Sequence, residues 1–377
     1  MARVDNRRDT DAVGAAVVQS EAGHHTTTRL PANMAYRRPV QDAVTRRGTG
    51  SHPAVRLGII GLGAIGNLQL QVLRASHQDR VQVVAAADHA RGGEDPGLPV
   101  YSDYRKLLQR DDVTAVAVNT PPSSHYSITV EALRAGKDVF VEKPPALLVE
   151  QAEHMIALAS ELGLCLFMAF HARYNAPVAL ARRALAGEKV LSADIVYRER
   201  VHDYHDPGGW VFDPAVSGGG ALMDSGINAL SVLASLTPQL RDYTLHEVRL
   251  GRAAGYTVET NADVAFAFGD GAVGRLCLDW LHAGPETRRV EIATFKHRYA
   301  IDIVHGRLER DGVLVAGPSR RSRRKVDQHA EYQAAYRDFA AHVARRISST
   351  STTELAFVRD SYAAAGVASR DVACGQA

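Results

Sequence analysis

Three closely spaced glycines have the arrangement of a phosphate-binding loop. The pattern G-x-G-x-x-G is formed by Gly61, Gly63 and Gly66, directly after the apolar run Val55–Ile60. In such a loop the first glycine allows a tight turn, the second lets the backbone approach a pyrophosphate, and the third lets the next helix pack on the strand. Asp88 follows at about the 20-residue offset of a ribose-binding acid. The spacing predicts a dinucleotide site; the alternative is a purely structural strand–turn–helix unit.

A lysine that could take part in catalysis follows another apolar run. Glu142-Lys143-Pro144-Pro145 comes directly after the strand expected at Asp138–Val141. A lysine at the carboxyl edge of a sheet, beside a cofactor, can donate a hydrogen bond, stabilise negative charge or, when desolvated, act as a base. Without the glycine loop, an ordinary surface lysine would be the better interpretation.

A carboxylate and an amide stand four residues apart in a second glycine-rich segment. Gly218-Gly219-Gly220 opens a predicted helix that carries Asp224 and Asn228. Residues four apart share one face of a helix, so this pair could hold a single sugar hydroxyl. The alternative is that Asp224 only caps the helix.

Apolar runs typical of strands alternate with helix-like segments from residue 55 to residue 170. The expected strands are 55–60, 81–87, 113–118, 138–141 and 164–170, and the expected helices are 65–76, 104–110, 124–135 and 147–162. Such alternation predicts a doubly wound parallel sheet of the α/β class. Because ligands bind at the carboxyl ends of its strands, Thr120, Glu142, Lys143 and His171 should lie near the cofactor.

The pattern of apolar and polar residues changes near residue 176. After a helix at 176–186, longer alternating runs predict a large, open, mostly antiparallel sheet with helices on one face, followed by helices at 331–344 and 353–368. The expected organisation is a disordered N-terminal extension (1–54), a dinucleotide-binding Rossmann domain (55–175), an α+β substrate and oligomerisation domain (176–352), and a C-terminal helix and tail (353–377) packing back on the Rossmann domain. The extension could instead be an arm that wraps a cofactor or a neighbouring subunit.

Composition excludes several classes of protein. The 377 residues carry a net charge of +2, which gives no argument for a nucleic-acid or membrane partner. The basic segment 318–325 lacks interleaved aromatic residues and is better interpreted as a solvated loop than as a nucleic-acid patch. Three distant cysteines indicate neither a disulfide framework nor a metal site. With no apolar run of about 18 residues, a cytoplasmic protein without a membrane span is expected.

Four motifs in order resemble the Gfo/Idh/MocA family, named for glucose–fructose oxidoreductase and inositol dehydrogenase. They are Gly61–Gly66, Thr120-Pro121-Pro122 with His125, Glu142–Pro144, and Gly218–Gly226. The resemblance covers roughly residues 55–370 and implies an enzyme with a Rossmann domain, NAD or NADP as cofactor, and a homo-oligomer, dimer or tetramer, built through the open sheet. The cofactor-binding residues it implies, together with the glycine loop itself, are Gly61, Gly63, Ala64, Ile65, Gly66, Asp88, Thr120, Pro121, Glu142 and Lys143.

One departure from the family pattern points to a branch. Many members carry a histidine four residues after the aspartate, whereas this chain has Asn228, an amide that cannot act as a base at neutral pH. The segment is similar to the aldose branch, the L-arabinose and D-galactose 1-dehydrogenases. That similarity implies five substrate-binding residues: Glu199, His205, His171, Tyr204 and Trp280.

The resemblance therefore implies oxidation of C1 of a galactose- or arabinose-type aldopyranose to the lactone. Lys143 and Asp224 are expected at the C1 hydroxyl, with Asp224 or a Lys143-linked water as the base, and Asn228 is expected to orient C1. Asp88 favours NAD, with some NADP use tolerated through Arg91. The alternatives are a cyclitol dehydrogenase, a sugar–sugar oxidoreductase, or a non-catalytic nucleotide sensor on the same fold. No metal is expected.

Overall fold

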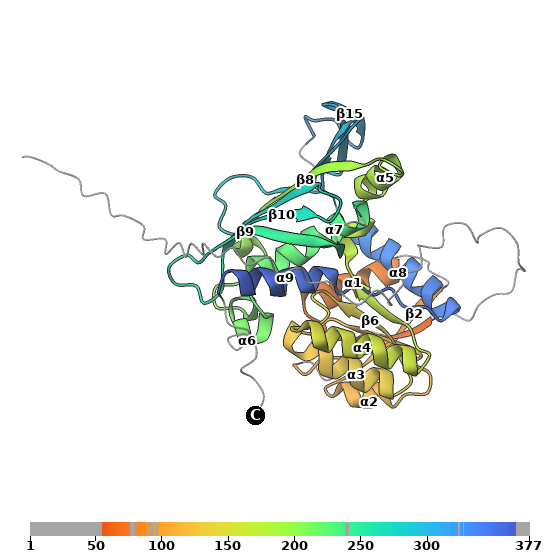
Figure 1. Ribbon diagram of the computed structural model, residues 1–377. Helices are drawn as coiled ribbons and strands as arrows, with labels where there is room; N and C mark the ends of the chain where they lie inside the picture. The colour runs from red at the N-terminus through yellow and green to blue at the C-terminus, as the bar shows by residue number, and fades with distance from the viewer. Residues whose placement is uncertain are drawn as a thin grey trace, which may run out of the picture.

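The computed structural model describes residues 55–75, 80–90, 93–95, 97–237, 241–322, 325–326 and 328–366. The extension expected at residues 1–54, Arg91 and the end of the expected C-terminal tail lie outside the described residues. The described chain forms two sheets, each associated with helices (Figure 1). Within this part of the chain, no helix has the length and apolar character needed to cross a membrane.

The first sheet confirms the predicted doubly wound architecture. Its strand order is β3-β4-β2-β1-β5-β6-β7, and all neighbours are parallel except β3 and β4. Its strands are β1 (Val55–Ile60), β2 (Val81–Ala87), β3 (Gly93–Asp95), β4 (Leu98–Tyr101), β5 (Ala115–Val118), β6 (Asp138–Glu142) and β7 (Leu166–Ala169). The central strands are continuous apolar runs because helices cover both faces. The strand order reverses between β1 and β5, so a ligand crevice is expected at their carboxyl ends.

Helices cover both sides of this sheet. They are α1 (Ala64–Ala75), α2 (Tyr104–Leu108), α3 (His125–Arg134), α4 (Val149–Glu161) and α8 (His329–Arg345). Helices α3 and α4 lie on one side, and α1 and α8 on the other (Figure 1). Although α8 follows the second sheet in sequence, it buries Tyr332, Tyr336 and Phe339 against the first, with the Tyr336 and Phe140 rings stacked 4.4 Å apart. The chain therefore returns to the first sheet before it ends.

The second sheet confirms the expected large, mostly antiparallel sheet. Its order is β15-β14-β13-β12-β8-β11-β10-β9, and the pair β8–β11 is parallel. Its strands are β8 (Val190–Arg198), β9 (Tyr243–Gly251), β10 (Asn261–Phe268), β11 (Val273–Asp279), β12 (Thr287–Thr294), β13 (Arg298–Asp302), β14 (Arg307–Arg310) and β15 (Val313–Ala316). Strand β15 is a short edge strand that the sequence pattern does not predict, since four residues carry too little alternation.

Helices α5 (Ala176–Ala184), α7 (Ile227–Leu236) and α9 (Thr353–Ala364) pack on one face of this sheet. Helix α9 lies on α7 and β9 and reaches the first domain at α4, where Arg359 Nη1 is 4.0 Å from Glu150 Oε1. Strand residues that alternate with the buried ones project from the opposite face. The domain boundaries themselves stay a prediction.

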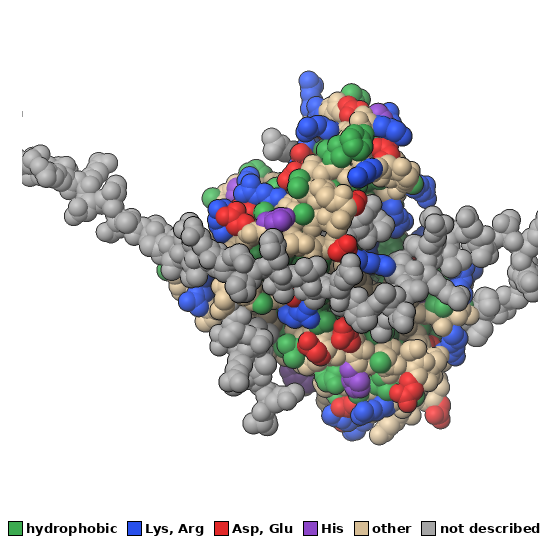
Figure 2. Space-filling model, in the orientation of Figure 1, with side chains coloured by type: hydrophobic (Ala, Val, Ile, Leu, Met, Phe, Trp, Pro, Cys, Tyr) green, Lys and Arg blue, Asp and Glu red, His purple; other side chains and the backbone are tan. Residues whose placement is uncertain are grey.

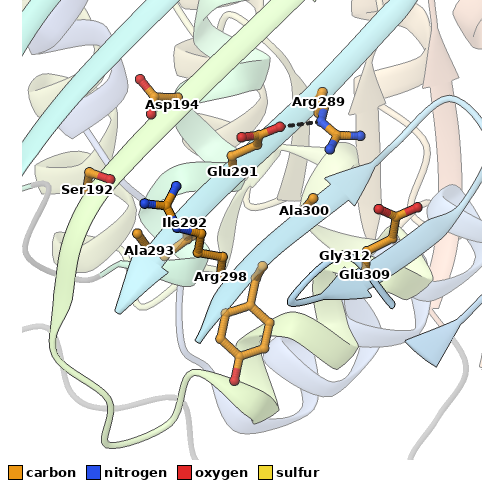
Figure 3. Close-up of a pocket in the computed structure, with 11 residues that line it drawn as sticks. Ser192, Asp194, Arg289, Glu291, Ile292, Ala293, Arg298, Ala300, Glu309 and Gly312 are labelled. Carbon is orange, nitrogen blue, oxygen red and sulfur yellow. Dashed lines mark hydrogen bonds and ion pairs between the residues drawn. The ribbon is translucent and has the colours of Figure 1, made fainter. Parts of the chain in front are cut away.

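That opposite face of the second sheet carries charges of both signs. A shallow pocket of about 180 Å³ lies there, and Figure 3 shows Arg289 and Glu291 paired in it beside Asp194. On the described part of the surface drawn in Figure 2, basic and acidic side chains are likewise interspersed.

Candidate active site

The glycine loop joins β1 to α1, and close backbone contacts require glycine at two of its three positions. Gly61 has φ +91°, and a Cβ there would lie 2.9 Å from the Asn119 backbone. A Cβ on Gly66 would lie 1.9 Å from the Gly61 carbonyl oxygen, whereas Gly63 has nothing within 4 Å of the same position. The loop is therefore closed toward the sheet and open at Gly63, which fits the approach of a pyrophosphate to the backbone.

Asp88 lies at the end of β2, beside the glycine loop. Its Oδ2 accepts a hydrogen bond from Leu62 N–H (2.7 Å) and its Oδ1 accepts one from Ala90 N–H (2.9 Å). Two backbone donors thus fix the carboxylate where the ribose of a dinucleotide is expected. That Asp88 contacts the ribose stays a prediction.

An unsatisfied acceptor stands next to the loop at the end of β5. Asn119 donates from Nδ2 to Gln69 Oε1 (2.8 Å), while its buried Oδ1 has no hydrogen-bond partner among the described residues. Buried polar atoms are normally paired, so this oxygen fits a donor on a bound ligand. Thr120 and Pro121 follow it directly and lead into the short helix η1 (Pro122–Ser124). The residues of this edge therefore fit a dinucleotide cofactor.

Glu142 is enclosed rather than open to a ligand. Its Oε1 accepts hydrogen bonds from Gln69 Nε2 and Tyr332 OH (both 2.8 Å), and its Oε2 accepts one from the Lys143 backbone N–H (3.0 Å). Burial raises the pKa of Glu142, and the attractions from His171 and Tyr332 only partly offset it. The position of this carboxyl indicates that it holds the end of β6, from which Lys143 projects.

Lys143 and Asp224 form an ion pair between the two domains. Lys143 follows β6, whereas Asp224 lies in the π-helix η5 (Leu222–Gly226) that precedes α7. Lys143 Nζ contacts Asp224 Oδ1, and the two side chains are 16% and 27% exposed. Burial alone would raise the pKa of Asp224, but the Lys143 ammonium, together with the charges of His205 and Arg288, offsets this and the pKa is lowered. The carboxylate is therefore ionised at neutral pH.

A second carboxylate fixes the turn that begins the Asp224 helix. Glu259 Oε1 accepts hydrogen bonds from Gly220 N–H and Leu222 N–H (both 2.9 Å) and from Tyr362 OH (2.8 Å). A Cβ on Gly219 would lie 2.0 Å from the Tyr362 hydroxyl oxygen, so glycine is required there. Sequence reasoning missed Glu259, because it stands alone between two strands with no motif around it.

Asn228 lies one helical turn beyond Asp224, in α7. Its Oδ1 is buried and lacks a hydrogen-bond partner among the described residues. Like the Asn119 oxygen, this acceptor fits a donor on a bound molecule, for example a sugar hydroxyl.

Glu199 and Arg288 adjoin the pair from the second sheet. Glu199 is buried, with Oε1 accepting from Arg288 Nε (2.6 Å) and Oε2 accepting from Ser225 Oγ. Arg288 also lies 3.0 Å from Glu286 Oε1 and is close enough to Asp224 to help lower its pKa. Arg288 was not predicted; the only sequence signal is the alternation of β12, which places it on the inner face.

The loop after β8 brings His205 and Tyr204 to the same region. The charges of Asp224 and Lys143 both influence the pKa of His205, which burial lowers. Tyr204 is 53% exposed, donates to Glu286 Oε2 (2.8 Å), and lies with its ring centroid 5.8 Å from Arg288 Cζ. Burial and the Glu286 carboxylate raise the pKa of Tyr204 to about 12, so it remains a neutral donor.

Trp280 and His171 are buried instead of presenting open faces. Trp280 is 1% exposed and donates from Nε1 to Ser225 Oγ (2.7 Å). His171 Nδ1 is 2.8 Å from Glu331 Oε2, and its ring stacks on Tyr332. Each side chain is buried by an element distant in sequence. The helix that carries Asp224 packs over Trp280, and α8 packs over His171. Neither is placed in the structure where a sugar ring could stack on it.

Within the described chain, no group of three or more His, Cys, Asp or Glu side chains could hold a metal ion. The site therefore consists of an ion pair, an amide and a loop, beside an edge that fits a dinucleotide.

Comparison with known proteins gives matches over both domains. Residues 55–170 match an oxidoreductase family model (GFO_IDH_MocA) with an NAD-binding Rossmann fold, and residues 186–299 match the GFO/IDH/MocA C-terminal domain. A galactose 1-dehydrogenase from Pseudomonas fluorescens is 27% identical, covering 82% of this chain and 95% of that protein. A dTDP-3,4-didehydro-2,6-dideoxy-alpha-D-glucose 3-reductase from Streptomyces antibioticus is 31% identical, covering 73% and 93%. The crystal structure of D-galactose-1-dehydrogenase from Rhizobium etli superposes with a TM-score of 0.73 at 26% identity, covering 83% and 96%.

Proposed function

The chain belongs to the Gfo/Idh/MocA family of oxidoreductases, and from this premise we propose that it oxidises C1 of a galactose- or arabinose-type aldopyranose to the lactone. The family assignment makes it an enzyme, a sugar or cyclitol oxidoreductase with an NAD(P)-binding domain. The observation that carries the finer proposal is the Lys143–Asp224 pair, placed between the dinucleotide-binding edge and the second domain.

Oxidation at C1 requires a proton to leave the C1 hydroxyl while a hydride leaves the carbon. Bound NAD supplies the hydride acceptor. The ionised Asp224 carboxylate would accept the hydroxyl proton, directly or through a water held by Lys143, and the Lys143 ammonium would stabilise the negative charge that develops on the oxygen. The lowered pKa of Asp224 keeps the carboxylate ionised at neutral pH, which is the form that can accept a proton.

The neighbouring residues would orient the sugar. The unpaired Oδ1 of Asn228 would accept a hydrogen bond from a hydroxyl near C1. His205 and Tyr204, on the loop beside the pair, would hold other hydroxyls and one face of the ring. Three other predicted substrate-binding residues are buried: Glu199, His171 and Trp280. We propose that they act indirectly, by holding Asn228, His205 and Tyr204 in place.

The proposal of C1 rather than another carbon rests on the similarity to galactose 1-dehydrogenases, and Asn228 bears on the identity of the base. A base four residues after Asp224 would allow a second proton acceptor, whereas the amide leaves the Lys143–Asp224 pair in that role. The relative from Streptomyces antibioticus is named for a reaction at C3, so the position of oxidation needs a direct test. Purified protein would be mixed with NAD or NADP and a panel of aldoses, glycosides and cyclitols, and the absorbance of the reduced cofactor followed. Reduction with free aldoses and not with their methyl glycosides supports the proposal; the reverse pattern contradicts it.

The proposal includes a homo-oligomer formed through the open face of the second sheet. The mixed charges there, such as the Arg289–Glu291 pair, would allow two copies of the face to meet with opposite charges opposed. Light scattering of the wild type and of Arg298→Glu, a change of charge on this face, would test it.

A further inference from the structure

A groove of about 570 Å³ lies beside the loop that carries His205. It runs between the segment 202–214, which contains the short helix η4 (Trp210–Phe212), and the turn between β9 and β10. The lining residues that matter for its chemistry are His202, Phe212, Asp213 and Tyr256. Lys143 and Asp224 are not among the residues that line it, so the groove is distinct from the ion pair.

Aromatic rings with polar edges form the wall of this groove. The Phe212 and Tyr256 rings meet edge to face with centroids 5.5 Å apart, and the His202 ring lies 5.4 Å from that of Phe212. His202 Nε2 is 2.7 Å from the Tyr256 hydroxyl oxygen. Phe212 is buried and supports the wall, whereas His202 is exposed and Tyr256 half-buried, so these two rings are the ones that a ligand can reach. Such rings suit the apolar C–H face of a pyranose, and their imidazole and hydroxyl edges can pair with its hydroxyl groups.

The charge of the lining decides the class of ligand. Among the described residues that line the groove there is no lysine or arginine, and Asp213 is the charged side chain. A nucleoside diphosphate would leave its phosphates unpaired beside a carboxylate, which is unfavourable. A neutral sugar ring has no such penalty.

The groove also adjoins the proposed catalytic pair through one short loop. His202 lines the groove, whereas His205, three residues later, is near Asp224 and Lys143. Three residues span at most about 10 Å, a length comparable to that of a disaccharide. The Trp210 and His205 rings meet edge to face with centroids 5.8 Å apart, so the segment beside the groove packs on the histidine that lies near the ion pair.

We propose that this groove binds a second, neutral pyranose ring attached to the sugar that is oxidised. The inference rests on the proposed function, because it assigns the first ring to the Lys143–Asp224 pair. It names the substrate class as a disaccharide or longer saccharide with a free reducing end.

The kinetic test compares galactose with disaccharides that carry a reducing-end galactose and a second neutral hexose at O3, O4 or O6. We expect at least one of them to have a kcat/KM about tenfold above that of galactose. Tyr256→Ala should remove this advantage while changing kcat/KM for galactose less than twofold. The matched control, Tyr256→Phe, keeps the ring and should keep most of the advantage. The proposal is overturned if no disaccharide exceeds galactose, or if Tyr256→Ala lowers both substrates equally.

A binding test separates this inference from the proposed reaction. The chain has two tryptophans, of which Trp210 is 42% exposed beside the groove and Trp280 is buried. The methyl glycosides of the same disaccharides cannot be oxidised at a free C1, and they should quench the Trp210 fluorescence saturably in the wild type and not in Tyr256→Ala. This result supports the groove even if no aldose is oxidised. Absence of quenching, or Tyr256-dependent binding of thymidine diphosphate instead, overturns it.

Discussion

Lys143 Nζ contacts the Asp224 carboxylate and also lies 3.3 Å from the Asp224 carbonyl oxygen. One ammonium group thus joins the end of a strand in the first sheet to both the side chain and the backbone of the helix start in the second domain. Lys143 from the first domain and Asp224 from the second thus form an ion pair across the contact between the domains.

Removal of the ammonium should both slow the reaction and shift its pH dependence. Lys143→Met should lower kcat by roughly 10²–10⁴, the usual scale of acid–base participation, with NAD affinity little changed. Burial raises the pKa of Asp224 and the ammonium opposes it, so without Lys143 this pKa should rise. In the wild type the lowered pKa of Asp224 means that this carboxylate should protonate only at a pH below that of an ordinary aspartate. The acid limb of kcat/KM should therefore lie at higher pH in Lys143→Met.

A matched variant for this experiment is Asp224→Asn, which should be slow at every pH. An acid limb in Lys143→Met at the wild-type position would show that Asp224 is not the titrating group. A kcat within a few-fold of wild type would remove Lys143 from the mechanism.

Asn228→Ala should separate activity from stability. The Oδ1 atom of Asn228 is a buried acceptor without a partner among the described residues, and removal of an unpaired group should not weaken the fold by the usual cost of a lost hydrogen bond. We expect an unchanged or slightly raised melting temperature together with a loss of kcat/KM smaller than that of Asp224→Asn. A loss equal to that of Asp224→Asn would contradict the orienting role.

Tyr362→Phe should weaken the support of the Asp224 helix. The hydroxyl donates to the half-buried Glu259 carboxyl group, whose pKa burial raises, and such a hydrogen bond contributes about 1 kcal/mol. Denaturant unfolding should show a loss of this size in the free energy of unfolding. The control is Tyr126→Phe, whose hydroxyl bonds to His154 at an exposed position and should cost under about 0.5 kcal/mol. Equal effects of the two changes would count against the proposed support.

Asp88→Ser should weaken the preference for NAD over NADP. A 2′-phosphate about 4 Å from the Asp88 carboxylate would be repelled by about 4 kcal/mol at an effective dielectric of 20, and even half of that is a preference of more than tenfold. The ratio of kcat/KM for the two cofactors should fall by about tenfold in the variant. The control is Asp111→Ser. Asp111 lies near the amino end of β5, away from the carboxyl ends where the cofactor is expected, so this change should leave the ratio unchanged. A wild type that prefers NADP would show that Asp88 does not bind the ribose.

The sequence predicts those parts of the fold and site that depend on local pattern. The G-x-G-x-x-G spacing of Gly61–Gly66 and the apolar strands fix the first sheet and its ligand edge, because turn geometry and helix–strand packing depend on neighbouring residues. Lys143 could be placed at that edge because it directly follows a strand.

Residues whose roles depend on tertiary cover could not be predicted. Trp280 was expected at the substrate, but whether a side chain at the end of β11 meets solvent or another helix is decided by η5, far away in sequence. Glu259 and Arg288 stand in no motif and gain their roles from partners on other elements. The sequence shows that α8 has an apolar, aromatic face. It does not show which of the two sheets that face covers.

Isotopic labelling of the sugar shows which carbon gives up the hydride. Galactose carrying deuterium at C1 would be incubated with the full chain and NAD, and the mass of the reduced cofactor measured, with galactose deuterated at C3 as the control. If C1 is oxidised, deuterium from C1 arrives in the reduced cofactor, with a lactone as product, and deuterium at C3 stays in the sugar. Transfer from C3, or reduced cofactor without label from C1, would contradict it.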